Sequence, residues 1–151
     1  MQIAIRKLIR PLRMADFAPE YGDDFFTVWV NPPRAQLEAY REIRGQNDAL
    51  LKRLGELAKA KANGGLSELE EGEAQKLGLQ MRDCSDRVYA WFAEIWSQGP
   101  DPSTHSTGQD VRDLAVRCER EDPALWLFLC TQTWHLINDH RDQAKKGRAT
   151  S

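Results

Sequence analysis

Hydrophobic side chains recur at helical spacing in two long stretches in the middle of the chain. In the first stretch they advance by alternating steps of three and four residues, which places them along one side of a helix. The expected stripe is Leu37, Tyr40, Ile43 or Arg44, Asn47, Leu51, Leu54 and Ala58. The second stripe is Leu77, Met81, Cys84, Val88, Trp91 or Phe92, and Ile95. Because Asn63-Gly64-Gly65 lies between them, the pattern predicts an antiparallel αα-hairpin over residues 32–97, with spacing typical of a coiled coil.

Both helices of this hairpin carry start signals at their N-terminal ends. Asn31 can cap the first helix, and the two prolines after it suit a first turn, where the missing N–H would be unpaired anyway. Ser67 and Glu70 have the spacing of a capping box, in which each side chain bonds the backbone N–H of the other residue. The second helix is therefore expected to begin directly after Ser67.

Two more helices are expected within residues 98–142. The proline-containing segment 98–103 ends the hairpin, and Thr107 then provides an N-cap for a short helix. Asp122-Pro123 begins the last helix through a cap followed by a proline. The apolar faces are Val111, Leu114, Ala115 and Cys118 in the short helix, and Leu125, Trp126, Leu129, Cys130, Thr133, Leu136 and Ile137 in the last one. The polar residues 143–151 are expected to fray.

The N-terminal residues 1–31 have strand character instead. The segment from Phe25 to Val30 is almost entirely β-branched or aromatic and predicts a strand. Ile3, Ile5 and Leu8 or Ile9 form a weaker β-like run, and the proline- and glycine-containing segment from Arg10 to Asp23 is expected to be a loop. The sequence thus predicts one mostly α domain over residues 1–151. It consists of a long αα-hairpin and C-terminal helices with a small N-terminal antiparallel β-ribbon.

The composition narrows the possible partners. The 21 basic and 23 acidic side chains nearly cancel, which disfavours nucleic acid or an anionic membrane as the partner. We expect a cytoplasmic protein, since no stretch approaches the length of a membrane span and the charged N-terminus does not resemble a signal peptide. The three cysteines, Cys84, Cys118 and Cys130, are expected to be reduced core thiols, because they are odd in number and widely spaced in apolar helices.

The polar residues do not form a pattern typical of catalysis. His135 and His140 are five residues apart, which is not the spacing of a zinc-binding helix, and the sequence contains no Cys-x-x-Cys pair. A half-buried His135 and a surface His140 are expected. Gly64-Gly65 lacks the Lys-Ser/Thr sequence of a phosphate loop. We therefore expect no catalytic residues, no metal site and no cofactor, and a protein that is not an enzyme.

The tryptophans are the candidate binding residues. Five tryptophans are many for a chain of 151 residues, and most are expected in the core because each buries a large area. However, Trp91 and Trp96 are five residues apart, and Phe26 and Trp29 lie on opposite faces of a strand, so both elements carry apolar bulk on more than one side. Such surface is covered by the rest of the fold or by another chain. The candidate partner-binding residues are Trp29, Trp91, Trp96, Trp126 and Trp134.

The layout of the chain resembles tail assembly chaperones of long-tailed, siphophage-like bacteriophages. The resemblance lies in the order of four segments, Ala18-Pro19-Glu20-Tyr21-Gly22-Asp23, Phe26-Thr27-Val28-Trp29-Val30-Asn31-Pro32-Pro33, Trp91-Phe92-Ala93-Glu94-Ile95-Trp96 and Asp122-Pro123-Ala124-Leu125-Trp126, and it covers most of the chain. It implies a non-enzymatic factor of the host-cell cytoplasm that binds apolar helices of the tape-measure protein and helps to recruit the tail-tube protein.

The long hairpin leaves two interpretations open within this resemblance. It is longer than a minimal chaperone requires, so it is either a dimerisation arm, which would make the protein a homo-oligomer, or part of a different phage structural protein. The alternative function is accordingly a virion structural or adaptor protein, such as a head–tail connector or tail-completion factor.

Overall fold

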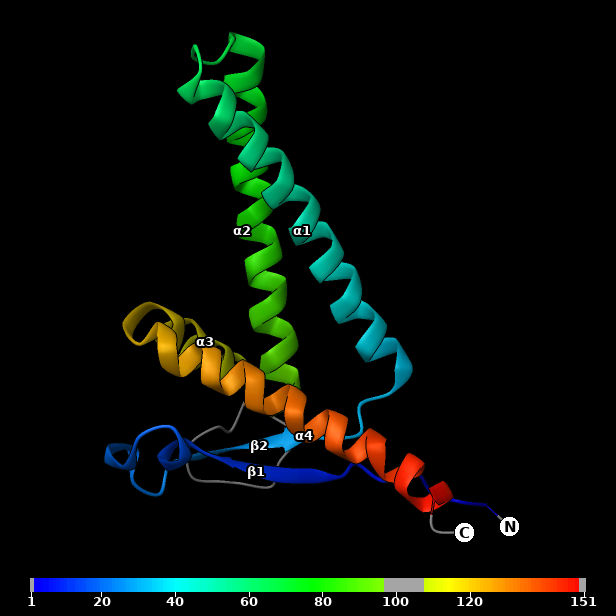
Figure 1. Cartoon of the computed structure of the whole chain (residues 1–151). Coiled ribbons are helices and arrows are strands. Elements are labelled where there is room, and N and C mark those ends of the chain that lie inside the picture. Colours follow the sequence, from blue (N-terminus) through cyan, green and yellow to red (C-terminus); the bar gives the residue numbers. More distant parts are fainter. Residues whose placement is uncertain (1, 97–107, 150–151) are drawn as a thin grey trace. The chain divides into compact units, whose positions relative to one another are not determined.

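The computed structural model describes residues 2–96 and 108–149, and it confirms a mostly α fold with a small antiparallel β-ribbon (Figure 1). The elements are β1 (Ile9–Arg13), the 3₁₀ turns η1 (Met14–Asp16) and η2 (Pro19–Tyr21), β2 (Phe25–Trp29), α1 (Arg34–Ala62), α2 (Glu68–Trp96), α3 (Gly108–Glu121) and α4 (Pro123–Ala149). The described chain forms two compact units. One is Arg34–Val88, here called the hairpin unit, and the other, the ribbon unit, combines the residues before 34 with those from Tyr89 onward.

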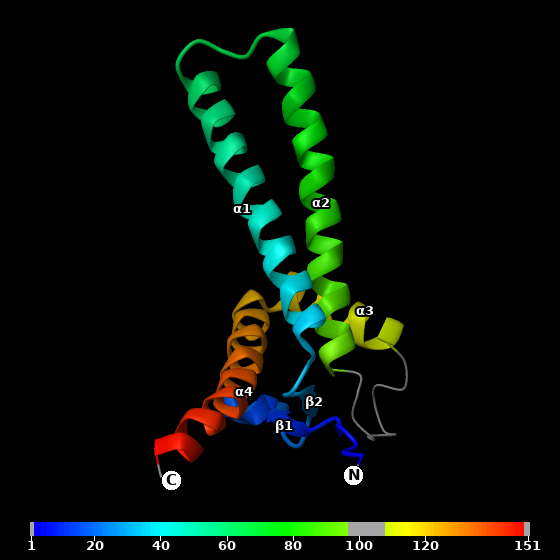
Figure 2. The same ribbon diagram turned by 90° about the vertical axis from the view of Figure 1, so that its right-hand side faces the viewer.

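The hairpin unit contains α1 and the part of α2 up to Val88, which run antiparallel and are joined by the loop of residues 63–67 (Figure 2). The predicted capping box is confirmed, since the Glu70 N–H donates to Ser67 Oγ and the Ser67 N–H donates to Glu70 Oε1, each at 3.2 Å. Gly65 has a φ of 85°, a conformation that costs glycine little but strains other residues. These local signals fix where α1 ends and α2 begins.

The predicted stripe of α1 is correct as far as Asn47 and again at Leu54, and it is wrong at Leu51 and Ala58. Ile43 is buried and Asn47 is half-buried as expected, but the next half-buried residue is Leu50, whereas Leu51 is 51% exposed. Leu57, rather than Ala58, is the buried residue near the end of the helix. Hydrophobic residues occupy both of these helical phases, so the apolar pattern alone could not decide between a step of three and a step of four after Asn47.

Polar side chains join the two helices of the hairpin unit. The guanidinium of Arg53 forms a two-point ion pair with the carboxylate of Glu73, with N–O distances of 2.6 and 2.9 Å. It also bonds Glu56 one turn further along α1 at 2.9 Å. Arg87 of α2 donates to Gln46 of α1 at 2.6 Å. Because these groups stay substantially exposed, the pairs align the helices more than they stabilise them.

The first strand of the ribbon begins later than the sequence predicts. Ile3 and Ile5, which were expected to start the strand, are exposed and have no regular structure, and all of β1 after Ile9 falls within the segment that was expected to be a loop. The strand includes Pro11, which pairs with Thr27. Hydrogen-bonded pairs in this ladder alternate, and the neighbouring pairs Leu8–Val30 and Met14–Asp24 fix their positions. Pro11 therefore occupies a non-hydrogen-bonded position, where its missing N–H costs no bond.

Asn31 has a different role from the predicted one. Its side chain does not cap α1 but faces the N-terminal segment, where Oδ1 accepts from the Leu8 N–H and Nδ2 donates to the Arg6 carbonyl, both at 2.7 Å. These two bonds imitate the backbone groups of a paired strand and extend the ribbon beyond β1. Asn31 thus fixes residues 6–8 beside β2.

The core of the ribbon unit lies between one face of the ribbon and the buried stripe of α4, which contacts both strands (Figure 1). The fully buried residues include Phe26, Val28, Leu129 and Ile137. Thr133 is also fully buried, and its hydroxyl accepts from Trp96 Nε1 at 2.9 Å while donating to the Leu129 carbonyl at 2.6 Å. A buried polar group is stable in this position because both of its hydrogen-bonding capacities are used. The helix α4 continues to Ala149, beyond the expected boundary at residue 142.

Candidate binding site

The structure brings four of the five tryptophans into one aromatic cluster of the ribbon unit. Trp91 and Trp96 are 4% and 1% exposed, so both are core residues. Trp91 stacks on Trp134 with ring centroids 5.3 Å apart and planes 9° from parallel. Trp126 and Trp134 are half-buried, and Trp126 meets Trp96 edge to face. Of this cluster, the half-buried tryptophans of α4 are those that a partner could touch without opening the core.

Trp29 lies apart from this cluster. It is half-buried on the face of the ribbon opposite the fully buried Phe26, as predicted, and the ammonium group of Lys7 lies 4.7 Å from its ring centroid. Its buried Nε1 has no hydrogen-bond partner among the described residues. A partner-binding role for the five tryptophans stays a prediction.

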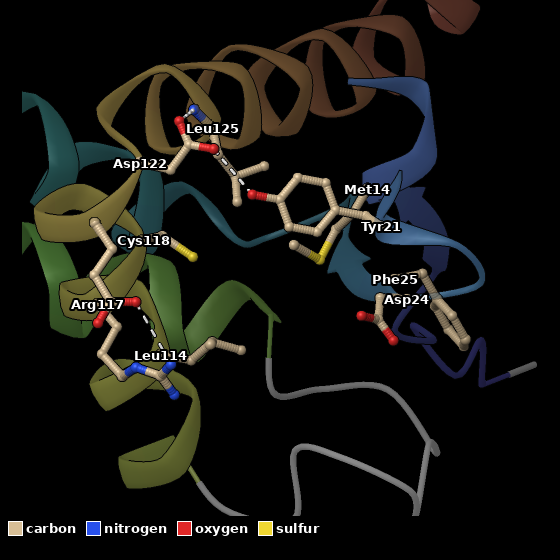
Figure 3. Close-up of a pocket in the computed structure, with 10 residues that line it drawn as sticks. Met14, Tyr21, Asp24, Phe25, Leu114, Arg117, Cys118, Asp122 and Leu125 are labelled. Atoms are coloured by element: carbon tan, nitrogen blue, oxygen red, sulfur yellow. Dashed lines mark hydrogen bonds and ion pairs between the residues drawn. The ribbon is translucent and has the colours of Figure 1, made fainter. Parts of the chain in front are cut away.

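A concave, mostly apolar site of the ribbon unit lies beside the corner between α3 and α4 (Figure 3). It is a pocket of about 310 Å³ with a largely apolar lining. Three segments line it: the N-terminal turns and the start of β2, the second half of α3, and the first turn of α4. The lining residues are Met14, Tyr21, Asp24, Phe25, Leu114, Arg117, Cys118, Glu121, Asp122 and Leu125.

The floor of this pocket is made by buried apolar side chains. Met14, Cys118 and Leu125 are all less than a tenth exposed, and half-buried Leu114 and Phe25 complete the apolar surface. The Met14 N–H donates to the Asp24 carbonyl at 3.0 Å, which holds η1 beside the start of β2. Gly22, with a φ of 61°, allows the chain to turn back between these two points.

The wall formed by the N-terminal turns is attached to α4 at two places. The ring of Phe17 contacts that of Phe128, with centroids 5.4 Å apart. The hydroxyl of Tyr21 donates to Asp122 Oδ2 at 2.9 Å, as drawn in Figure 3. Asp122 Oδ1 in turn accepts from the Leu125 N–H at 3.3 Å, which is the predicted N-cap of α4. The pocket wall is therefore preformed and does not depend on a ligand for its position.

The polar rim of the pocket carries more negative than positive charge. Asp24, Glu121 and Asp122 are acidic and Arg117 is basic, which leaves a formal balance of −2. Arg117 lies 3.6 Å from Glu121, so its charge is largely offset within α3. The pKa of Tyr21 is raised, first by its hydrogen bond to the Asp122 carboxylate and then by burial, with Glu20 adding a smaller effect in the same direction. The region around Tyr21 is thus an electronegative edge above an apolar floor.

The cysteines and histidines do not assemble around this pocket. Cys84 and Cys118 are buried and Cys130 is half-buried, and all three are free thiols as predicted. Burial raises the pKa of Cys118, and it raises that of Cys130 to about 12, so both thiols are poor nucleophiles. The predicted burial of the histidines is reversed, because His135 is exposed and His140 is half-buried. Within the described residues, no group of three or more potential ligands is placed to hold a metal ion.

Comparisons with protein-family models, with curated proteins and with solved structures return no match for this chain. No helix of the described residues is long and apolar enough to cross a membrane.

Sequence reasoning found the tryptophans but missed this pocket. Its residues come from three segments far apart in the sequence, and most of them carry no signal beyond ordinary helix or turn chemistry. The one available hint was Asp122, the predicted cap of α4, because a cap lies at the corner where two helices meet and where a third segment can contact both.

Proposed function

We propose that this protein is a non-enzymatic tail assembly chaperone of a long-tailed bacteriophage. In this proposal it acts in the host-cell cytoplasm, binds apolar helices of the tape-measure protein and aids assembly of the tail-tube protein. The proposal rests on the resemblance of the sequence segments and on one structural observation, the preformed apolar pocket beside the α3–α4 corner.

The pocket supports a role in binding helices because of its size and position. About 310 Å³ is at the small end of ligand pockets and suits one or two apolar side chains rather than a large cofactor. Helices that dock in grooves do so through a few apolar anchors on one face. Leu127 of α4, 67% exposed, and the half-buried Trp126 and Trp134 offer further apolar contact area on the same helix that contributes Leu125 to the pocket.

The experiment is a binding assay of the full-length protein against overlapping fragments of the tape-measure protein from the same genome. We expect one or more predicted helical fragments to bind, and Leu114→Gln to weaken binding at least tenfold by making the pocket lining polar. Leu79→Gln is the matched control, since it makes the same change on a 65% exposed residue of the hairpin unit that does not line the pocket. Absence of binding by the folded wild-type protein to every fragment would refute the proposal.

A second measurement separates the chaperone from the alternative of a virion structural or adaptor protein. A chaperone leaves before the particle is complete, whereas a connector or completion factor stays. We therefore expect the protein to be absent from purified virions by mass spectrometry and present in lysates of infected cells. Stoichiometric amounts in virions would favour the adaptor.

A further inference from the structure

The apolar floor of the pocket suits an apolar side chain, and the charge of the rim indicates what else the ligand should carry. Met14, Cys118 and Leu125 line the pocket and are each less than a tenth exposed, so an apolar group that entered would cover apolar surface that remains open to water. The rim above them is acidic by two formal charges, and the basic group of Arg117 already has Glu121 beside it.

Asp122 and Asp24, the two acidic residues beside the N-terminal wall, differ in their hydrogen bonding and exposure. Both oxygens of Asp122 accept hydrogen bonds, one from Tyr21 and one from the Leu125 backbone, so its negative charge is stabilised by neutral donors. Asp24 is exposed, and its backbone carbonyl accepts from Met14. Neutral donors do not cancel the negative charge of Asp122. The edge of the pocket therefore attracts a cationic group of a ligand whose apolar part lies on the floor.

We infer that the pocket binds a leucine-sized side chain of a partner helix that carries a lysine or arginine one turn away. An apolar anchor fills the floor, and the basic group meets the rim formed by Asp24, Asp122 and the Tyr21 hydroxyl. On a helix, residues three or four positions apart lie on the same face, so both groups can reach one pocket. The inference rests on the proposed function for the identity of the partner, but its chemistry can be tested without any phage protein.

The first test uses three small probes with the same branched tail and different head groups: 3-methylbutylamine, 3-methylbutanol and 3-methylbutanoate. Binding to the full-length protein is followed by NMR at the methyl groups of Met14, Leu114 and Leu125. For molecules of this size we expect dissociation constants of millimolar order. We expect the amine to bind at least about threefold more tightly than the alcohol, and the carboxylate most weakly, with the differences shrinking at high salt.

Two single-charge variants make the test specific to the rim. Asp24→Asn removes one of the two rim carboxylates, so it should reduce the preference for the amine over the alcohol and leave the affinity of the alcohol unchanged. Asp23→Asn removes the same charge from the next residue, which is exposed and lines a neighbouring hollow but not this pocket, so it should preserve the preference for the amine. Both residues are on the surface, and unchanged spectra of the remaining methyl groups would show that each variant folds.

A second test uses two helical peptides that differ in one residue, a lysine or a glutamate four positions after a leucine. The lysine peptide is expected to bind at least about fivefold more tightly and to shift the same methyl groups. Equal affinity for both peptides, preference for the carboxylate probe, or absence of shifts at the pocket would overturn the inference. If the probes behave as expected but no tape-measure fragment binds, the proposed function fails alone. If a fragment binds while the probes do not, the inference about the pocket fails alone.

Discussion

The hydroxyl of Tyr21 donates a 2.9 Å hydrogen bond to Asp122, 101 residues further along the chain. The same carboxylate caps the first turn of α4 through the Leu125 N–H. One side chain therefore both begins a helix and fixes the N-terminal turns against it. This shared use of Asp122 gives the pocket its shape before any ligand arrives.

The free energy of unfolding should reflect this double role. We expect Tyr21→Phe to cost about 0.5–1 kcal/mol, because one partly exposed hydrogen bond is lost. Asp122→Ala should cost more, about 1–2.5 kcal/mol, since it removes the cap as well. Asp122→Asn is the control that keeps one acceptor oxygen for the Leu125 N–H and places an NH2 donor beside the Tyr21 hydroxyl, so it should cost less than Asp122→Ala. Urea denaturation that gave equal losses for Tyr21→Phe and Asp122→Ala would contradict the double role.

In an alkaline titration, the hydroxyl of Tyr21 should ionise at a higher pH than an ordinary tyrosine. Its pKa is raised above the ordinary value of 10, chiefly because the neutral phenol donates to Asp122. Because the folded state favours the neutral phenol, the hydrogen bond from Tyr21 to Asp122 contributes its full stability below pH 10. That contribution is lost as the pH rises through the raised pKa. Ultraviolet absorbance should show a late-titrating tyrosine that disappears in Tyr21→Phe. A curve unchanged by that substitution would contradict the assignment.

The buried pair Trp96–Thr133 should be sensitive to loss of the Thr133 hydroxyl. Thr133→Val leaves Trp96 Nε1 buried without its acceptor, and we expect a cost of about 1–3 kcal/mol in the free energy of unfolding. Thr133→Ser keeps the hydroxyl and loses a methyl group, for a cost of about 1 kcal/mol. In a Trp96→Phe background the effect of Thr133→Val should shrink, because the donor is gone. If Thr133→Val cost as much in that background, its effect on the free energy of unfolding would not come from the hydrogen bond to Trp96.

The three thiols should react slowly in the folded protein. Burial raises the pKa of Cys130 to about 12, so on the order of one part in ten thousand of this thiol is ionised at pH 8. Cys84 and Cys118 are buried within helices. We expect a disulfide reagent to modify all three cysteines at least about a hundredfold faster in denaturant than in buffer. A thiol that reacted in buffer at the rate of a free cysteine would disprove this arrangement.

Local chemistry explains why much of the fold could be predicted from the sequence. The capping box of Ser67 and Glu70, the Asp122 cap and the β-branched run before Val30 are signals that act within a few residues, and the structure confirms them. The errors occur where the deciding contact is distant. Ile3 and Ile5 have strand propensity, but the ladder is positioned further along by the pairing of Leu12 with Phe26, which buries both side chains.

The candidate site was less predictable than the fold for the same reason. The tryptophans attracted attention by their number, yet Trp91 and Trp96 lie in the core. Meanwhile Met14 and Leu114 line the pocket without any local feature that indicates it. A binding site assembled from three distant segments depends on tertiary packing, which residue types and spacing do not contain.

NMR can show directly whether a tape-measure fragment binds in the pocket beside the α3–α4 corner. In a complex of the full-length protein with an isotope-labelled fragment, we expect nuclear Overhauser effects from a leucine, isoleucine or methionine methyl of the fragment to the methyl groups of Met14, Leu114 and Leu125. A bound fragment whose contacts fell elsewhere on the protein, with these three methyl groups unaffected, would contradict binding in this pocket.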